Sequence, residues 1–539
     1  MSSISGIKID PSDNEGNTSD NVISNPTVKI LKVPKQFADE SYKLLSQIQV
    51  CDPTAEEAER IRNKCIKWIL PFICIGYHIM YVDKQTCLKL GSSAILGILE
   101  DAHLNSNQYN WLSSIFYFGY LLAEWPQNWA LQRFPVGKWL SLNLVVWAGF
   151  LYLHIACSNF AGLFVVRFFL GTAEACIVPS FLLILSMFFT YDEQAVLMPC
   201  MWAIGNSSPV TSGLLSYGVL FIKTGSFAPW KWFMVITASL TLLLATSIYF
   251  FFPNSPLTAH FLTPKERAQA ILRIKGNHSG IEQKRFKRYQ FIEALKDPKT
   301  WMFFLHAWSQ EMANGLTNQY SLIINSFGFS VLQTTLLGCV TGVTAFVSLA
   351  IAAWLLAYTK NSRAWISSAS YILPIISAIL LIGKYLTLPW SDRWGLVTAI
   401  WIRSPTGIPY AVVMVWAANC SAGHTKKTTV IALYHIGYGL GNILSPQLFQ
   451  PQYKPRYYVP WGVILGIASL FPAALVLYIR YYLNKENKRR DGLVAAGKEI
   501  QEIGIVESTN VDGHHVDHAV DNNQLDLTDR ENLAFRYVL

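Results

Sequence analysis

The chain has 539 residues, of which 52% are hydrophobic and only 14% are charged. Soluble globular proteins carry about a quarter charged residues, so this composition argues against an ordinary soluble protein. The formal net charge of +9 would suit a nucleic-acid-binding protein, but the basic residues lie in loops beside long apolar segments. This placement predicts contact with a lipid bilayer instead, and we expect no nucleic acid as partner.

Twelve apolar stretches are each long enough to cross a bilayer, which takes about 20 residues in a helix. We therefore predict an all-α integral membrane protein with 12 transmembrane helices. In chain order the stretches cover approximately residues 66–90, 110–130, 138–157, 161–188, 198–222, 231–252, 301–324, 332–358, 364–384, 394–418, 428–450 and 460–482.

A polar, basic segment divides these stretches into two groups of six. With both chain ends on one side, the loops on that side carry about sixteen Lys and Arg residues and the opposite loops about seven, which predicts cytosolic tails and a cytosolic linker. The predicted organisation is a mostly disordered tail over residues 1–65, a six-helix bundle over 66–252, a basic linker over 253–300, a second six-helix bundle over 301–482 and a tail over 483–539.

The nine cysteines do not indicate a metal or redox site. They are scattered, most lie within apolar stretches, and none shows a CxxC or zinc-like spacing, so we interpret them as small hydrophobic residues. The sequence also carries neither a Walker A loop nor a nucleophile elbow. We expect no metal, no cofactor and no enzymatic activity.

Two predicted spans carry ionisable residues well inside them: Asp83 and Lys84 near the end of the first, and Arg167 and Glu174 in the fourth. An ionised side chain at the centre of a membrane helix costs roughly 3 kcal/mol, so such residues are rare unless they have a function. Arg167 and Glu174 are seven residues apart, which puts them on one helix face about 10 Å from each other. We predict that Glu174 and Asp83 carry protons and that Lys84 and Arg167 hold an anion. The alternative is a buried Arg167–Glu174 ion pair that only holds helices together.

Arg403 is a further candidate anion ligand, in the tenth predicted span. It lies in the segment IWIRSPTGIP, where Pro405, Gly407 and Pro409 are expected to interrupt the helix. Backbone groups freed by such an interruption, beside an arginine, form a candidate anion site. The alternative is an arginine whose long side chain reaches the outer membrane interface.

Five other polar residues inside the spans are secondary candidates. Glu124 is expected to hydrogen-bond neighbouring helices rather than touch a substrate. His435 has the titration range of a proton relay, although a lone membrane histidine is more often a hydrogen-bond donor between helices. Glu311, Asn314 and Asn318 in the seventh span would bind either a substrate or neighbouring helices.

Several local motifs resemble those of one transporter family. They are YNWLSSIFYFGYLLAEWPQNWALQRFPVGKW from Tyr109, RFFLGTAEACIVPSF from Arg167, FFPNSPLTAHFLTPKER, GYGLGNILSPQLF and the C-terminal DLTDRENLAFRYVL. Together they resemble the fungal allantoate permease family, a branch of the anion:cation symporters within the major facilitator superfamily. Within it the chain looks most similar to the permeases for sulfur compounds. The resemblance implies two six-helix bundles and transport by alternating access.

The resemblance also implies roles for individual residues. Symporters and exporters of sugar acids and sialic acid show an Asp-Arg pair in the first helix and an R…G..E pattern in the fourth. The matching residues here are Asp83-Lys84 and Arg167…Gly171…Glu174. Lys84 stands where the pattern has arginine, and lysine offers a point charge rather than a two-pronged donor. Recognition of a planar carboxylate at this position is therefore not implied.

The expected function is proton-coupled uptake of a small anion, with a sulfonate, sulfate or a related sulfur compound as the first choice. The expected partners are this anion, a proton and the lipid bilayer, and we expect a monomer in the plasma membrane. The alternatives are a symporter of another organic anion, such as allantoate, ureidosuccinate, a vitamin or a cysteine-like substrate, and an exporter in a vacuolar, vesicular or endoplasmic reticulum membrane. A non-transporting nutrient sensor is a further alternative.

Overall fold

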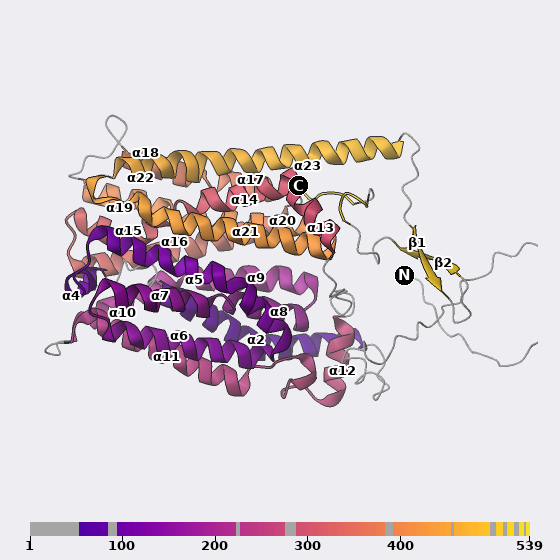
Figure 1. Cartoon of the computed structure of the whole chain (residues 1–539), viewed down its shortest axis with the longest axis horizontal. Coiled ribbons are helices and arrows are strands. Elements are labelled where there is room, and N and C mark those ends of the chain that lie inside the picture. Colours follow the sequence, from indigo (N-terminus) through magenta and orange to yellow (C-terminus); the bar gives the residue numbers. More distant parts are fainter. Residues whose placement is uncertain are drawn as a thin grey trace, which may run out of the picture.

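The computed structural model describes residues 53–84, 94–222, 227–274, 287–359, 361–382, 392–453, 457–495, 503–509, 515–521, 528–532 and 535–539. Nearly all regular structure in these ranges is helical, and the helices run along one common direction in two groups (Figure 1). The end of the molecule that carries α12, α13 and the C-terminus is here called the tail face. The opposite end is called the far face.

The first group of helices forms six spans that run back and forth between these faces. They are α2 (Ala55–Asp83), α5 (Ser106–Arg133), α6 (Val136–Ala156), α7 (Phe160–Glu174) with α8 (Ile177–Phe188), α9 (Tyr191–Asn206) with α10 (Ser208–Val219), and α11 (Pro229–Phe251). Short turns η3 (Ala94–Ile98) and α4 (Leu99–Asp101) follow α2, and η4 (Pro256–Thr258) and α12 (Pro264–Arg273) follow α11.

The second group repeats the arrangement after α13 (Arg288–Lys296). Its spans are α14 (Pro298–Glu311) with α15 (Gly315–Ser326), α16 (Val331–Tyr358), α17 (Arg363–Ala369) with α18 (Ile372–Ile382), α19 (Arg393–Ile402) with η6 (Ser404–Thr406) and α20 (Gly407–Asn419), α21 (His424–Leu444), and α22 (Tyr458–Leu465) with η9 (Gly466–Leu470) and α23 (Phe471–Ala495). Short turns η7 (Ser445–Leu448) and η8 (Pro451–Tyr453) follow α21, and β1 (Ile503–Thr509) pairs antiparallel with β2 (His515–Asp521).

The outer surface of both groups is suited to lipid. Large apolar side chains such as Leu243, Phe250 and Trp354 are exposed along the helices. Seven segments of the described residues are long and apolar enough to cross a membrane: Ala55–Asp83, Val136–Ala156, Phe160–Phe188, Pro229–Phe251, Val331–Tyr358, Arg363–Ile382 and Tyr458–Leu493. Helices also occupy the other five predicted spans, as α5, α9 with α10, α14 with α15, α19 with α20, and α21. The twelve predicted spans are thus all present as helices.

Capping residues explain where several helices begin. Thr54 and Glu57 exchange backbone and side-chain hydrogen bonds at the start of α2, as a capping box does. As a result α2 already begins at Ala55, inside the segment expected to be a tail, and Ile61 and Cys65 are buried. The expectation of disorder over the preceding residues lies outside the described ranges.

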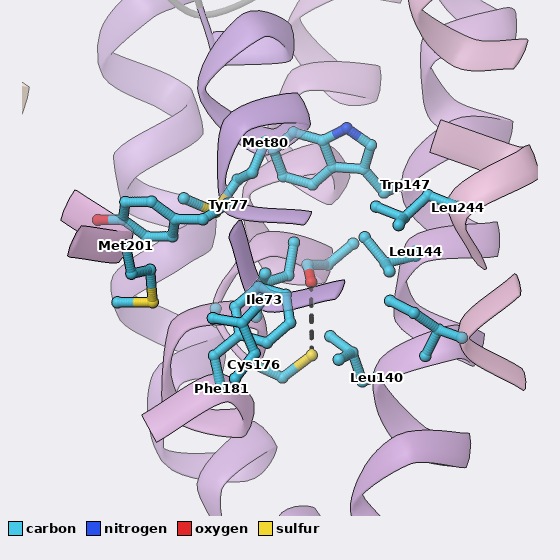
Figure 2. Close-up of a cluster of buried hydrophobic side chains, with 14 of the residues drawn as sticks. Ile73, Tyr77, Met80, Leu140, Leu144, Trp147, Cys176, Phe181, Met201 and Leu244 are labelled. Carbon is cyan, nitrogen blue, oxygen red and sulfur yellow. Dashed lines mark hydrogen bonds between the residues drawn. The ribbon is translucent and has the colours of Figure 1, made fainter. Parts of the chain in front are cut away.

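The interior of the first group is a continuous apolar core around α2 (Figure 2). Tyr77 of α2 lies beside Met201 of α9 in this view, whereas Leu140, Leu144 and Trp147 of α6 lie on the other side. The two sides of α2 therefore meet different neighbours. This orientation decides which way the charged residues at its end point.

Two glycines allow α5 and α7 to touch. A Cβ atom on Gly171 would collide with the backbone oxygen of Phe116, and one on Gly119 would collide with the backbone oxygen of Phe168. Small residues permit such close backbone approach between membrane helices. The glycine of the R…G..E pattern therefore has a packing role.

Substitution of Gly171 by alanine is expected to separate these helices and lower the stability of the protein by about 1–3 kcal/mol, because the core has no room for an added Cβ atom. Thermal denaturation of the detergent-solubilised protein measures this effect. Gly149→Ala on α6 is the matched control, since a Cβ there meets no atom within 4 Å. Equal melting temperatures for the two variants would contradict this account of the contact.

The C-terminal residues pack against the tail face of the second group. The carboxylate of Asp529 is completely buried and pairs with Lys299 at the start of α14, and with Lys426 of α21 at 2.9 Å. Tyr537 donates its hydroxyl to the same carboxylate at 2.6 Å. Arg490 of α23 donates to the backbone oxygens of Asp529 and Phe535 at 2.9 and 2.7 Å.

The described residues 528–532 and 535–539 are here called the C-terminal clasp. The clasp contacts Arg490, which lies in the region predicted to be a tail, and Lys299 and Lys426, which lie near the ends of spans. In the structure α23 continues to Ala495, past the predicted end of the last span, and Arg490 is nearly fully buried. The clasp thus joins the ends of α14, α21 and α23 into one unit.

Candidate functional site

Polar contacts hold the two helix groups together near the far face. Tyr109 at the start of α5 donates its hydroxyl to the backbone oxygen of Asn318 at 2.9 Å. Asn110 donates to the backbone oxygen of Phe449 at 3.0 Å and accepts from Gln319 at 2.8 Å. Asn318, a candidate substrate ligand, therefore contributes a contact between bundles through its backbone.

A cavity of about 290 Å³ lies between the two bundles and is lined by residues of both. Its walls carry charges of both signs. Among the described residues, the charged groups and the histidine that line it are Lys84, Glu174, Glu311, Arg403 and His435. These residues come from α7, α14 and α21, from the cap of α2 and from the break after α19.

Lys84 and Glu174 form an ion pair on the wall contributed by the first bundle. The side chain of Glu174 is 1% exposed and that of Lys84 is 9% exposed. The Lys84 ammonium group also lies 5.3 Å from the centre of the Tyr81 ring. Breaking a buried pair by removing one partner costs about 3–5 kcal/mol, so each group depends on the other or on a replacement ligand.

Asp83 points away from this cavity. Its carboxylate accepts a hydrogen bond from the indole nitrogen of Trp147 on α6 at 2.8 Å and another from the hydroxyl of Thr241 on α11 at 2.7 Å. Adjacent residues on a helix point about 100° apart, so Lys84 and Asp83 face different neighbours. The structure does not bring Asp83 to the cavity wall where a proton-carrying residue was expected.

Arg167 is not among the described residues that line the cavity either. It is completely buried, and its guanidinium lies 3.4 Å from the backbone oxygen of Leu112 on α5. Arg167 shares a helix face with Glu174, but it lies two turns nearer the far face, where α5 covers α7. The alternative of an Arg167–Glu174 ion pair is not what the structure shows, since Glu174 pairs with Lys84.

Arg403 lies at a break in the tenth span, directly after α19 and before η6. One guanidinium nitrogen, Nη2, donates to the backbone oxygen of Ala313 at 2.7 Å. The Nε atom is buried and has no hydrogen-bond partner among the described residues. Arg403 faces the cavity rather than the outer interface, and it retains donor capacity.

Glu311 ends α14 and faces the same cavity. Its Oε2 atom accepts a hydrogen bond from Asn442 of α21 at 3.0 Å. Asn314 also lines the cavity and donates to the side-chain oxygen of Asn442. This orients the Asn442 amide toward Glu311, and Asn442 is a site residue that we did not predict.

The remaining candidates are divided between cavity and helix packing. His435 of α21 lines the cavity. Glu124 of α5 is half-buried and is not among the described residues that line the cavity, which agrees with the expectation that it touches no substrate.

Aromatic residues form much of the cavity wall, and the sequence analysis missed them. Tyr117 of the first bundle packs on Tyr438 of the second with ring centres 6.1 Å apart. Tyr410 lies between Tyr438 and Trp202, at 5.2 and 5.6 Å. A hydropathy pattern counts tyrosine as one more apolar residue, so these side chains gave no separate signal.

Comparison with known proteins identifies the fold and the family. The sequence pattern of the Major Facilitator Superfamily matches residues 73–458. The described architecture resembles the crystal structure of a D-xylose-proton symporter, with a TM-score of 0.57, 10% identity, and coverage of 76% of this chain and 97% of that one. The predicted fold is confirmed.

Curated relatives match along nearly the whole chain. An uncharacterised transporter of Schizosaccharomyces pombe is 36% identical over 94% of this chain and 89% of its own length. A high affinity cysteine transporter of Saccharomyces cerevisiae is 32% identical over 94% and 96%, and the allantoate permease of the same yeast is 30% identical over 98% and 95%. The chain therefore belongs to the Major Facilitator Superfamily as a relative of these fungal permeases, and it is a multi-pass secondary transporter rather than an enzyme.

Proposed function

We propose that this protein takes up a small sulfur-containing acid together with one or more protons. The proposal rests on one observation, the buried Lys84–Glu174 pair on the wall of a cavity shared by both bundles. A buried ion pair is weak evidence for stability, and intramembrane ionisable residues most often serve transport. The name of the cysteine-transporter relative favours a sulfur compound.

The pair supplies a simple coupling mechanism. When a proton binds Glu174, Lys84 loses its counter-charge and becomes available to an anionic group of the substrate. Arg403, which lines the same cavity, offers a second contact from the opposite bundle. Rocking of one bundle against the other then carries both ligands across, and departure of the substrate restores the Lys84–Glu174 pair with release of the proton.

The proposal also covers the membrane in which the protein resides and its orientation in that membrane. We propose a monomer in the plasma membrane with the tail face in the cytosol, on the strength of the basic residues in the loops of that face. A fluorescent fusion distinguishes the plasma membrane from a vacuolar or reticular one, where the same transporter would act as an exporter.

Uptake measurements test the proposal. In yeast cells without their own sulfur-compound permeases, expression of this chain is expected to give uptake of a labelled sulfur compound from a panel of cysteine, sulfonates and sulfate. This uptake should rise as the medium is acidified and disappear when a protonophore is added. Allantoate and vitamins serve as the comparison substrates. Uptake that is indifferent to both pH and protonophore would refute proton coupling, and preference for allantoate or a vitamin would refute the sulfur assignment.

A further inference from the structure

The charges on the cavity wall follow a pattern with consequences for the substrate. The first bundle contributes a basic residue from its first span, Lys84, and an acidic residue from its fourth, Glu174. The second bundle contributes an acidic residue from its first span, Glu311, and a basic residue from its fourth, Arg403. The formal charges of the described lining residues therefore cancel. A site for an inorganic dianion would carry excess positive charge.

In the first bundle the two charges at the cavity wall form an ion pair. Lys84 and Glu174 neutralise each other. Arg403 also lines the cavity, and its Nη2 atom donates to the backbone oxygen of Ala313. Guanidinium groups bind carboxylates and sulfonates strongly through two adjacent donors. Arg403 is thus the group best able to receive the acidic end of a substrate.

Glu311 offers a complementary contact close by. Ala313, whose backbone oxygen accepts the hydrogen bond from Arg403, lies two residues beyond Glu311, in the turn that follows α14. Asn442 donates to Glu311 Oε2 at 3.0 Å and so supports its negative charge. A carboxylate of this kind accepts further hydrogen bonds from an ammonium group. The wall of the second bundle therefore presents a cation and an anion side by side.

The aromatic wall favours the same class of ligand. Tyr117, Tyr410 and Tyr438 surround the cavity with ring faces and edges. Aromatic faces attract an ammonium group and pack against an organic body. A strongly hydrated inorganic dianion such as sulfate gains little from them.

We propose that the substrate is a zwitterion, in which Arg403 binds the carboxylate and Glu311 binds the ammonium group of an α-amino acid. This inference rests on the proposed function and makes it more specific, because it names both head groups of the transported acid. The inference also assigns a different function to each bundle. The Lys84–Glu174 pair couples transport to the proton and frees Lys84 as an additional contact for the carboxylate, and the Arg403 and Glu311 side chains select the solute.

Ligand-induced thermal stabilisation of the purified full-length protein in lipid nanodiscs tests the proposal. Each L-amino acid, with L-cysteine as the first choice, is compared with inorganic sulfate. For L-cysteine the matched analogues are 3-mercaptopropionate, which lacks the ammonium group, and cysteamine, which lacks the carboxylate. We expect an amino acid to stabilise the protein, and each single-headed analogue to need at least about tenfold higher concentration, since one lost contact of 1.4 kcal/mol is a factor of ten.

Variants assign the contacts to individual residues. Glu311→Gln is expected to lose the preference for the amino acid over its deaminated analogue while it still binds the analogue. Glu124→Gln is the matched control, because Glu124 is a half-buried glutamate of α5 that is not among the described lining residues, and it should keep the preference. Stronger stabilisation by sulfate or 3-mercaptopropionate than by any amino acid, or no stabilisation by any amino acid, would overturn the proposal. Acid-stimulated, protonophore-sensitive uptake of the better ligand would still support proton-coupled transport in that event.

Discussion

Glu174→Gln is expected to abolish accumulation of the substrate against its gradient. A proton that moves down one pH unit supplies about 1.4 kcal/mol, which allows about tenfold accumulation of a co-transported solute. Without an ionisable group at position 174 this coupling is lost, and the inside-to-outside ratio should fall to about one. Exchange of labelled for unlabelled substrate should continue, because exchange needs no net proton movement. Uptake into proteoliposomes with and without an imposed pH gradient measures both quantities.

The same substitution leaves Lys84 buried without its counter-charge, at a cost of about 3–5 kcal/mol, so the folded fraction must be measured alongside. The double variant Glu174→Gln/Lys84→Gln removes both charges and is expected to recover stability without recovering accumulation. Glu124→Gln is the control for a neutralised glutamate elsewhere in the first bundle. A folded double variant that accumulates substrate as the wild type does would contradict the coupling role of the pair.

Asp529→Asn is expected to have the largest effect on stability outside the cavity. The substitution removes one of the two buried carboxylates that Lys299 and Lys426 share, the other being Asp297. Removal of one partner from a buried cluster costs up to about 3–5 kcal/mol. Thermal denaturation of the solubilised protein measures the loss. Asp491→Asn is the matched control, because Asp491 pairs with Arg536 at 2.9 Å with its side chain 63% exposed, and exposed pairs contribute about 0–1 kcal/mol.

The clasp also has a defined dependence on pH. Burial by itself would raise the pKa of the Asp529 carboxyl, but the ammonium groups of Lys299 and Lys426 outweigh burial and lower the pKa from 3.8 to about 2. A carboxyl group with a lowered pKa in the folded state stabilises the fold above its ordinary pKa and loses this contribution as pH falls toward the lowered value. The difference in stability between wild type and Asp529→Asn should therefore persist down to about pH 4 and vanish near pH 2. A difference that vanishes near neutral pH would contradict the assigned contacts.

The sequence predicted the helices well because long apolar stretches leave few alternatives to membrane-spanning helices. It also directed attention to Lys84 and Glu174, since charges in such stretches are costly. It did not predict which way Asp83 points. A helix can turn either of two adjacent residues toward a cavity, and the partners that decide the matter, Trp147 and Thr241, lie on helices distant in the sequence.

Other features depended on contacts that no local pattern encodes. Arg167 and Glu174 share a face of the fourth span, but only the packing of α5 against α7 determines that Arg167 is covered. Asp529 lies in a polar stretch typical of a tail, and its partner Lys299 is 230 residues away. The break beside Arg403 was predicted from the proline and glycine residues there, but the sequence left open whether Arg403 faces the cavity or the outer interface.

The most direct test of the account is the proton flux that accompanies substrate entry. Wild-type protein is reconstituted into liposomes that contain a pH-sensitive dye, and L-cysteine is added outside with no imposed pH gradient and with the membrane potential clamped at zero. We predict that the lumen acidifies in step with the uptake of labelled cysteine. Uptake of cysteine without acidification of the lumen would contradict the central claim that the Lys84–Glu174 pair exchanges a proton in each transport cycle.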